Sequence, residues 1–102
     1  MTDITYDYNS LIIEGHSGYG EIGSDIVCAG ISTITFTIAE WFNRNFWLFS
    51  SLHTDLENPG YARFDFELNE SDESHRQELD ALVIGYELLA EQFPDFVRFN
   101  HI

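Results

Sequence analysis

The segment from residue 62 to residue 68 alternates strictly between apolar and charged side chains. Its apolar positions are Ala62, Phe64, Phe66 and Leu68. Its charged positions are Arg63, Asp65 and Glu67. Since successive side chains of a strand point to opposite faces, this pattern predicts a strand with one buried and one solvated face. A sheet with such a strand needs a covering layer on one side only, which limits the architectures open to the chain.

Residues that favour turns divide the other strand-forming segments. Asn9-Ser10 separates the first predicted strand from the second, and Asn58-Pro59-Gly60 separates the third from the fourth. The predicted strands are Ile4–Asn9, Leu11–Gly15, Leu52–Glu57 and Tyr61–Leu68, with Phe96–Asn100 as a candidate for a short last strand.

Between the two strand pairs lies a long apolar segment that fits two interpretations. Residues 31–38, ISTITFTI, alternate as a strand would, and their β-branched side chains suit a strand. Apolar residues also recur at helical spacing, at Val27, Ile31, Ile34, Ile38 and Trp41 or Phe42. The segment is roughly 18 residues long, whereas strands rarely exceed ~10. We therefore expect a buried helix, with Ser24 or Asp25 as its N-cap.

A second helix is predicted after the polar segment NESDESHRQE. Ser74-x-x-Gln77 could form a capping box at its start, and Pro94 would end it. Its apolar stripe consists of Leu79, Leu82, Val83, Tyr86, Leu89, Ala90 and Phe93.

The resulting order of elements is β-β-α-β-β-α, with the candidate last strand after it. Burying both helical stripes against a sheet gives an α+β fold, a two-layer sandwich of an antiparallel sheet with two helices on one face. A length of 102 residues fits one domain, so we expect residues 1–102 to form a single domain.

The charge balance is extreme, because 18 acidic residues outnumber four arginines and give a net charge of −14. This charge argues against binding to nucleic acid or to an anionic membrane, and it favours a basic protein partner or mimicry of a nucleic acid. An acidic surface that only keeps an aromatic-rich domain soluble explains it equally well. The first residues lack the features of a signal peptide, and no apolar run approaches the ~20 residues that span a bilayer. We therefore expect a cytoplasmic protein.

The glycine-rich segment GHSGYGEIGSDIVC, residues 15–28, fits two kinds of site. Its Gly18-x-Gly20-x-x-Gly23 spacing is that of a dinucleotide-binding loop between a strand and a helix. Glu21 inside the loop and the net charge would both repel a pyrophosphate. A Rossmann unit also needs a parallel strand after the helix, with an acidic residue about 20 residues on, which the predicted order lacks. We therefore expect no nucleotide and no other cofactor.

The same segment places Cys28, the only cysteine, twelve residues after His16. If Asp25 caps the helix, Cys28 lies in its first turn, where the helix dipole stabilises a thiolate, and Ser32 follows on the same face. A glycine-rich loop can bring the imidazole to the sulfur as a general base. Taken singly, these residues also fit structural roles as a cap, a buried thiol, a backbone-bonded serine and a solvated histidine. The histidines show no metal-ligand spacing, so we expect no metal site.

Residues 15–32, GHSGYGEIGSDIVCAGIS, closely resemble the signature of the bacterial ribosomal-processing cysteine proteases, the Prp family. That signature is Gly-His, a glycine-rich loop, Asp-Ile-Val-Cys-Ala and a serine four residues after the cysteine. The resemblance implies that Cys28 is the nucleophile and His16 its general base, with Asp25 and Ser32 in supporting positions. It also implies a mobile loop that closes on the substrate, formed by Gly15, Ser17, Gly18, Tyr19, Gly20, Glu21 and Gly23.

The resemblance further implies a substrate and an assembly. Prp proteases remove a short N-terminal extension from a large-subunit ribosomal protein, cut after a hydrophobic, aromatic-containing sequence, and act as homodimers. A basic ribosomal protein or, in a bacterial virus, a virion protein would be the substrate of this chain. The alternative function is a non-enzymatic acidic binding protein, either a nucleic-acid mimic or a holder of basic proteins, in which His16 and Cys28 have no role.

Overall fold

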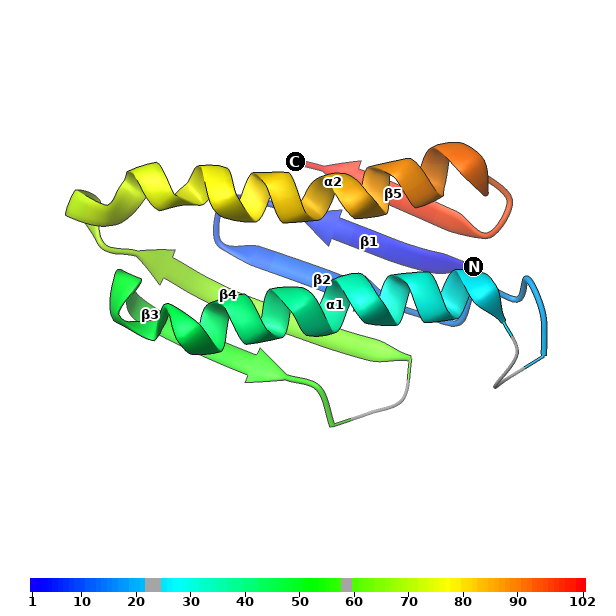
Figure 1. Ribbon diagram of the computed structural model, residues 1–102, viewed down its shortest axis with the longest axis horizontal. Helices are drawn as coiled ribbons and strands as arrows, with labels where there is room; N and C mark the ends of the chain where they lie inside the picture. Colours follow the sequence, from blue (N-terminus) through cyan, green and yellow to red (C-terminus); the bar gives the residue numbers. More distant parts are fainter. Residues whose placement is uncertain (22–24, 58–59) are drawn as a thin grey trace.

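The sheet and the helices form two separate layers in the computed structural model, which describes residues 1–21, 25–57 and 60–102 (Figure 1). In this part of the chain the strands are β1 (Thr2–Tyr6), β2 (Ser10–Glu14), β3 (Phe49–Asp55), β4 (Tyr61–Leu68) and β5 (Val97–His101). The helices are α1 (Ile26–Arg44) and α2 (Arg76–Gln92), with short 3₁₀ helices η1 (Phe46–Leu48) and η2 (Glu70–His75). Both long helices lie over the same face of the sheet, so the predicted two-layer α+β sandwich is confirmed.

The strands are ordered β3-β4-β2-β1-β5 across the sheet. The pairs β1–β2, β2–β4 and β3–β4 are antiparallel, which agrees with the predicted orientation, although the sequence did not predict that β2 pairs with β4. The candidate last strand is present as β5, and it pairs parallel with β1, from Thr2 opposite Val97 to Tyr6 opposite His101. The sheet is therefore mixed rather than wholly antiparallel. The reason is that α2 carries the chain back along the length of the sheet, so that β5 starts beside the start of β1.

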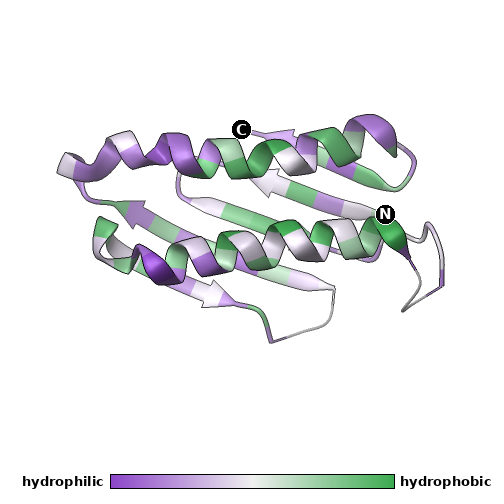
Figure 2. Ribbon diagram, viewed as in Figure 1, coloured by the Kyte–Doolittle hydropathy of each residue, from purple (hydrophilic) through white to green (hydrophobic). Residues whose placement is uncertain are grey.

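The alternation in β4 sets which face of the sheet the helices cover. Its four apolar side chains are between 0% and 7% exposed, as the pattern predicted. Ala62, Phe64 and Phe66 belong to one core with apolar side chains of β1, β2 and both helices. Phe42 of α1 stacks on Phe64 of β4 with ring centroids 5.1 Å apart. Figure 2 shows the alternation as bands of apolar and polar residues along the strands.

The segment with two interpretations is a helix, as its length predicted. Its threonines fit a helix because each hydroxyl donates a hydrogen bond to the carbonyl four residues earlier. These bonds measure 2.7–2.9 Å and run from Thr33 to Ala29, Thr35 to Ile31 and Thr37 to Thr33. The polar groups that made the segment resemble a strand are thus satisfied inside the helix itself.

The two helices approach each other closely over the core. The Tyr86 hydroxyl of α2 lies 2.7 Å from Oγ1 of Thr35, a buried residue of α1. A Cβ at Gly85 would lie only 2.8 Å from the side chain of Ile34, so glycine permits the contact. Thr35 is thus among the buried residues of α1, whereas Ile34 is partly buried and packs against Gly85 of α2.

The start of α2 differs from the prediction. Ser74 lies within η2, and the N-cap of α2 is His75, whose side chain makes no capping hydrogen bond. The proposed Ser74-x-x-Gln77 capping box is therefore wrong. The reason is that η2 continues directly into α2, so that the backbone N–H of Arg76 already donates to carbonyls of η2. The helix ends before Pro94, as predicted.

By length and composition alone α1 could cross a membrane, because it has 19 residues and a mean hydropathy of 1.3. It is the segment of the described chain that comes closest to the ~20 apolar residues of a membrane span. A helix that packs in a protein core passes the same test. Here one face of α1 is buried against the sheet and α2, which accounts for the apolar residues of that face, such as Ile31, Ile38 and Phe42.

One end of the sheet brings together elements that are far apart in the sequence. β2 ends at Glu14, which pairs with Tyr61, the first residue of β4. β1 begins at the same end, since Asp3 pairs with Glu14. Figure 1 shows that α1 also begins at this end. Residues that follow β2 therefore lie near the first turn of α1.

Candidate active site

Asp25 holds the first turn of α1. It is the N-cap of the helix, as one of the two predictions stated, and Ser24 lies outside the described residues. Its Oδ1 accepts hydrogen bonds from the backbone N–H groups of Val27 at 2.9 Å and Cys28 at 3.0 Å. These two donors have no partner inside a helix, and the carboxylate satisfies both.

The second oxygen of Asp25 binds the chain that follows β2. Its Oδ2 accepts hydrogen bonds from the Ser17 hydroxyl at 2.5 Å and from the N–H of Gly20 at 3.2 Å. Burial raises the pKa of Asp25, but the hydrogen bonds from Ser17 and from the N–H groups of Cys28 and Gly20 outweigh it. The pKa therefore lies well below its usual value, and the carboxylate is ionised at neutral pH.

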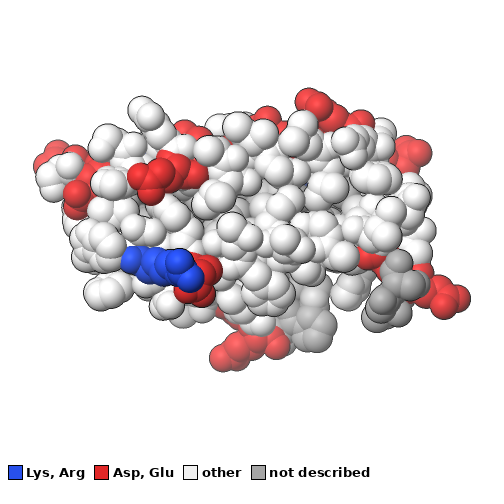
Figure 3. Space-filling model, viewed as in Figure 1, with Lys and Arg blue, Asp and Glu red and all other residues white. Residues whose placement is uncertain are grey.

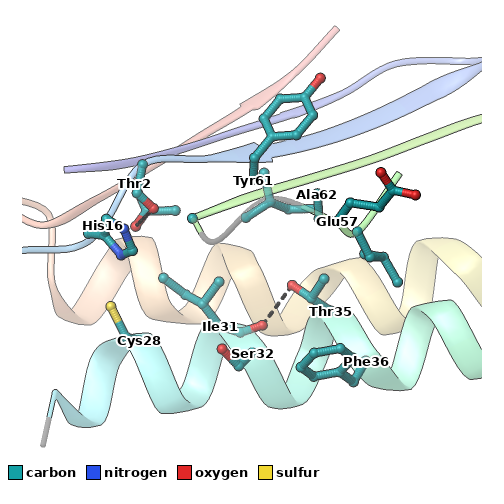
Figure 4. A pocket seen from close by; sticks show the side chains of 14 residues that line it. Thr2, His16, Cys28, Ile31, Ser32, Thr35, Phe36, Glu57, Tyr61 and Ala62 are labelled. Atoms are coloured by element: carbon teal, nitrogen blue, oxygen red, sulfur yellow. Dashed lines mark hydrogen bonds between the residues drawn. The ribbon is translucent and has the colours of Figure 1, made fainter. Parts of the chain in front are cut away.

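Cys28 lies in the first turn of α1 and is half-buried. Its Sγ is 3.3 Å from the hydroxyl oxygen of Ser17. The residue lines a cavity of about 360 Å³, together with His16 and Ser32. Figure 4 shows the sulfur directed toward the imidazole of His16, with Ser32 one turn further along the helix.

His16 follows the end of β2, and its ring packs over Gly60. A Cβ at Gly60 would lie 2.8 Å from Nε2 of His16, and the backbone there has φ +73°. Only glycine adopts this conformation without strain and leaves the room that the ring occupies. The N–H of Gly15 donates to the Gly60 carbonyl at 2.7 Å, which fixes the two segments to each other.

The walls of the cavity come from several elements. One wall is mostly apolar and consists of Ile13, Ile31, Phe36, Leu56, Tyr61 and Ala62. Thr2 and Thr35 add hydroxyls, and Glu57 adds a carboxylate (Figure 4). The cavity therefore offers an apolar surface beside the thiol and the imidazole, with one acidic side chain at its edge.

The structure brings together most, but not all, of the predicted site residues. His16, Cys28, Ser32 and Gly15 line the cavity, and Asp25 supports it from behind the helix start. The loop residues Gly18, Tyr19, Gly20 and Glu21 do not line it, and Gly23 lies outside the described residues. The ring of Tyr19 instead packs edge-on against Phe93 and Phe96, with centroids 5.3 and 5.2 Å away.

Ser17 and Gly60 have contacts that the sequence did not reveal. The resemblance places Ser17 in the loop that closes on the substrate, but Ser17 is 1% exposed and contacts both Asp25 and Cys28. Gly60 was assigned to a turn between strands, which accounts for a glycine without reference to a site. Its contact with His16 depends on the pairing of β2 with β4, which the sequence did not predict.

The described residues contain no group of three or more His, Cys, Asp or Glu side chains placed to hold a metal ion.

Comparison with known proteins identifies the family. The model of the cysteine protease Prp family matches residues 1–98, which is nearly the whole chain. The chain belongs to the Prp family. It is therefore a cysteine protease, as the sequence signature predicted.

Relatives and solved structures agree with this assignment. A ribosomal processing cysteine protease Prp of Mycoplasma pneumoniae is 27% identical over 98% of this chain and 94% of its own. The crystal structure of an essential ribosomal processing protease Prp from S. aureus, in complex with a covalently linked product peptide, is 25% identical. It covers 99% of this chain and 97% of its own with a TM-score of 0.75. A crystal structure from Streptococcus mutans is 30% identical, covers 99% of this chain and 91% of its own, and has a TM-score of 0.70.

Replacing Gly60 tests whether this glycine places the imidazole. Gly60→Ala would put a Cβ 2.8 Å from Nε2 of His16 and strain the backbone at φ +73°. We expect the ring to move and, if His16 acts in the reaction, kcat/KM for a peptide substrate to fall by about ten- to a hundredfold, because a displacement of ~1 Å in an active site has effects of that size.

Gly30→Ala is the matched control, since its Cβ would meet Leu89 at 3.5 Å, an ordinary contact distance. We expect the control to retain the parent kcat/KM. Equal activities of the two variants would contradict the role given to Gly60.

The lowered pKa of Asp25 predicts a pH-dependent contribution to stability. The unfolded chain binds this proton near pH ~4, and the folded protein binds it only at lower pH, so the ionised form stabilises the fold above about pH 4. This contribution is lost as the pH falls below that value. Asp25→Asn retains a capping side chain but cannot ionise.

We therefore expect Asp25→Asn to be less stable than the parent at neutral pH, and the difference in unfolding free energy to narrow as the pH falls from about 4 to about 2. Urea denaturation of the parent and the variant at each pH measures this difference in unfolding free energy. Asp95→Asn, in the exposed turn before β5, controls for the loss of one negative charge. If the difference in unfolding free energy between Asp25→Asn and the parent did not change with pH, ionisation of Asp25 would not be what stabilises the fold.

Proposed function

We propose that this Prp-family protein is an endopeptidase in which Cys28 is the nucleophile and His16 its general base. The observation that carries the proposal is that the thiol and the imidazole line one cavity from two different elements. The helix start favours a negative sulfur, and the cavity has room for a peptide segment beside it. Asp25 and Ser32 would support the pair, Asp25 by holding the helix turn that carries the sulfur.

In this mechanism the scissile carbonyl lies beside Sγ of Cys28. His16 takes the thiol proton as the sulfur attacks the carbonyl carbon, and it then gives that proton to the departing amine. A thioester remains, and water activated by His16 hydrolyses it and restores the thiol. The covalently linked product peptide in the S. aureus relative is consistent with a nucleophilic mechanism of this kind.

Stabilisation of the oxyanion requires a rearrangement of the loop. Backbone N–H groups at a helix start are suited to holding an oxyanion, but those of Val27 and Cys28 already donate to Asp25. The N–H of Gly20 donates to the same carboxylate. An oxyanion hole needs donors aimed at the reacting oxygen. We infer that donors of the segment Ser17–Glu21 change partners when a peptide binds, which agrees with the expected mobility of this loop.

The substrate we propose is the N-terminal extension of a large-subunit ribosomal protein, cut after a hydrophobic or aromatic sequence. Relatives from M. pneumoniae and S. aureus carry the name of ribosomal processing proteases. The apolar wall of the cavity suits a hydrophobic side chain, and a net charge of −14 attracts a basic protein. A basic virion protein would satisfy the same chemistry.

We further propose that the chain acts as one cytoplasmic domain that forms a homodimer and binds no nucleic acid. Figure 3 shows that the face covered by the helices carries few charges, although the protein is strongly acidic. Exposed apolar side chains on these helices include Ile26, Phe36, Ile84 and Leu88. Such a surface suits contact with a second copy, and sedimentation equilibrium would then give twice the mass of 11.8 kDa.

Cleavage of a peptide with a Phe-Phe-Ala junction tests the nucleophile. We expect Cys28→Ala to abolish cleavage and to leave the circular dichroism spectrum unchanged, because the residue is half-buried and alanine suits a helix. The control is Ala29→Ser, which changes an exposed neighbour in the same turn and should retain activity. Undiminished cleavage by Cys28→Ala would refute the assignment.

The pH dependence of thiol alkylation separates this proposal from the acidic binding protein. For a Cys-His pair, we expect iodoacetamide to reach half its maximal rate at a lower pH in the parent than in His16→Ala, since the imidazole favours the thiolate. A binding protein in which the two residues have no role would give the same midpoint in both. His53→Ala, on β3 and outside the cavity, is the control.

A further inference from the structure

Ser17 is enclosed between the thiol and the carboxylate of the site. Its side chain is 1% exposed. Its Oγ is 3.3 Å from Sγ of Cys28 and 2.5 Å from Oδ2 of Asp25. The backbone N–H of Tyr19 also donates to this oxygen at 3.3 Å. The mechanism proposed above does not involve these contacts of Ser17.

The direction of these hydrogen bonds follows from the charge on Asp25. An ionised carboxylate can only accept, and a hydroxyl has a single proton to donate. The four donors around Asp25 and the lowered pKa of its carboxyl group keep it ionised. Ser17 therefore donates its proton to Asp25, and only the lone pairs of Oγ face the sulfur. The contact between Ser17 and Cys28 then requires an S–H donor.

We propose that Ser17 is a positioning residue for the nucleophile, which accepts the S–H of Cys28 and so holds the sulfur protonated and in one rotamer. The proposal rests on the proposed role of Cys28 as the nucleophile. A thiolate at this position would face the lone pairs of Oγ instead of a donor, unless the serine turned its proton away from Asp25. Ser17 thus couples the protonation of the thiol to the charge of the carboxylate.

Other titratable groups also act on this thiol. His16 faces it across the cavity, Glu57 and Tyr61 line the same cavity, and Asp25 lies behind the helix turn. Glu21 lies in the loop that follows Ser17. A single variant would therefore report on several effects at once. The contribution of Ser17 is isolated by comparing how Ser17→Ala shifts the pH midpoint of thiol alkylation in the parent and in the Asp25→Asn variant.

The first measurement is the pH midpoint of iodoacetamide alkylation in the parent and in Ser17→Ala. Removing Ser17 removes one acceptor of the S–H and leaves the carboxylate of Asp25, to which the Cys28 side chain also hydrogen-bonds, so the thiol form loses part of its stabilisation. We expect the midpoint to fall by about 0.3 to 0.5 pH unit, because a thiol is a weak donor.

The second measurement repeats the comparison in the Asp25→Asn background. The amide of this variant can donate to Oγ of Ser17, which frees the serine proton to point at the sulfur and favour the thiolate. In this background we expect Ser17→Ala to raise the midpoint by about 0.3 to 0.5 pH unit. The same substitution thus shifts the midpoint in opposite directions, which a serine with a purely structural role would not produce.

Ser10→Ala is the matched control, because Ser10 is also buried, at 9% exposure, and lies at the opposite end of β2. It should leave the midpoint unchanged in both backgrounds. Ser17→Thr retains the hydroxyl and should restore the parent midpoint, which also serves as the test if Ser17→Ala does not fold. A shift of the same sign in both backgrounds, no shift, or a folded Ser17→Thr that fails to restore the midpoint would overturn the proposal.

These outcomes are separate from the test of the proposed function. Alkylation reports on the thiol itself and needs no substrate. Cleavage by Cys28→Ala would refute the nucleophile, whereas loss of cleavage in Cys28→Ala with shifts of equal sign for Ser17→Ala would refute only the role of Ser17.

Discussion

The carboxylate of Asp25 is the group on which the arrangement of the site depends. From the described residues it accepts four hydrogen bonds, two from the segment after β2, at Ser17 and Gly20, and two from the first turn of α1, at Val27 and Cys28. Taking a charge out of water costs free energy, and these donors offset the cost. The same bonds fix the helix turn that carries the sulfur against the segment that carries the imidazole. A shorter or neutral side chain could cap the helix but could not bind both segments as strongly.

The imidazole is held from the sheet, independently of Asp25. Gly15 leaves β2 with φ +94°, and a side chain there would collide with the carbonyl of Met1. Its N–H binds the carbonyl of Gly60, over which the His16 ring packs. The imidazole of His16 thus belongs to the end of the sheet where β2 and β4 pair, while the thiol of Cys28 belongs to a helix on the face of the sheet. The segment Ser17–Glu21 lies between these two anchors, and the rearrangement for oxyanion binding is proposed for it because the N–H of its Gly20 donates to the same carboxylate as the helix start.

Much of the fold followed from the sequence, because local patterns reflect burial. The alternation in β4 predicted which side chains are buried, and the length of α1 distinguished a helix from a strand. The parallel pairing of β5 was not predictable, since it depends on where α2 returns the chain. The same limit applies to the site. The spacing of His16 and Cys28 indicated a pair, whereas the contact with Gly60 needed the β2–β4 pairing, and the burial of Ser17 needed the path of the loop.

The net charge of the protein bears on how a thiolate could form in this site. A protein with a net charge of −14 opposes the release of a proton to solvent, because release adds one more negative charge to a negative field. Asp25, close to the sulfur, opposes it further. Transfer from Cys28 to His16 leaves the net charge unchanged and creates an ion pair inside the cavity. For the proposed mechanism, these charges favour transfer of the proton from Cys28 to His16 within the cavity over its release to solvent. The proposed S–H contact with Ser17 fits the same requirement.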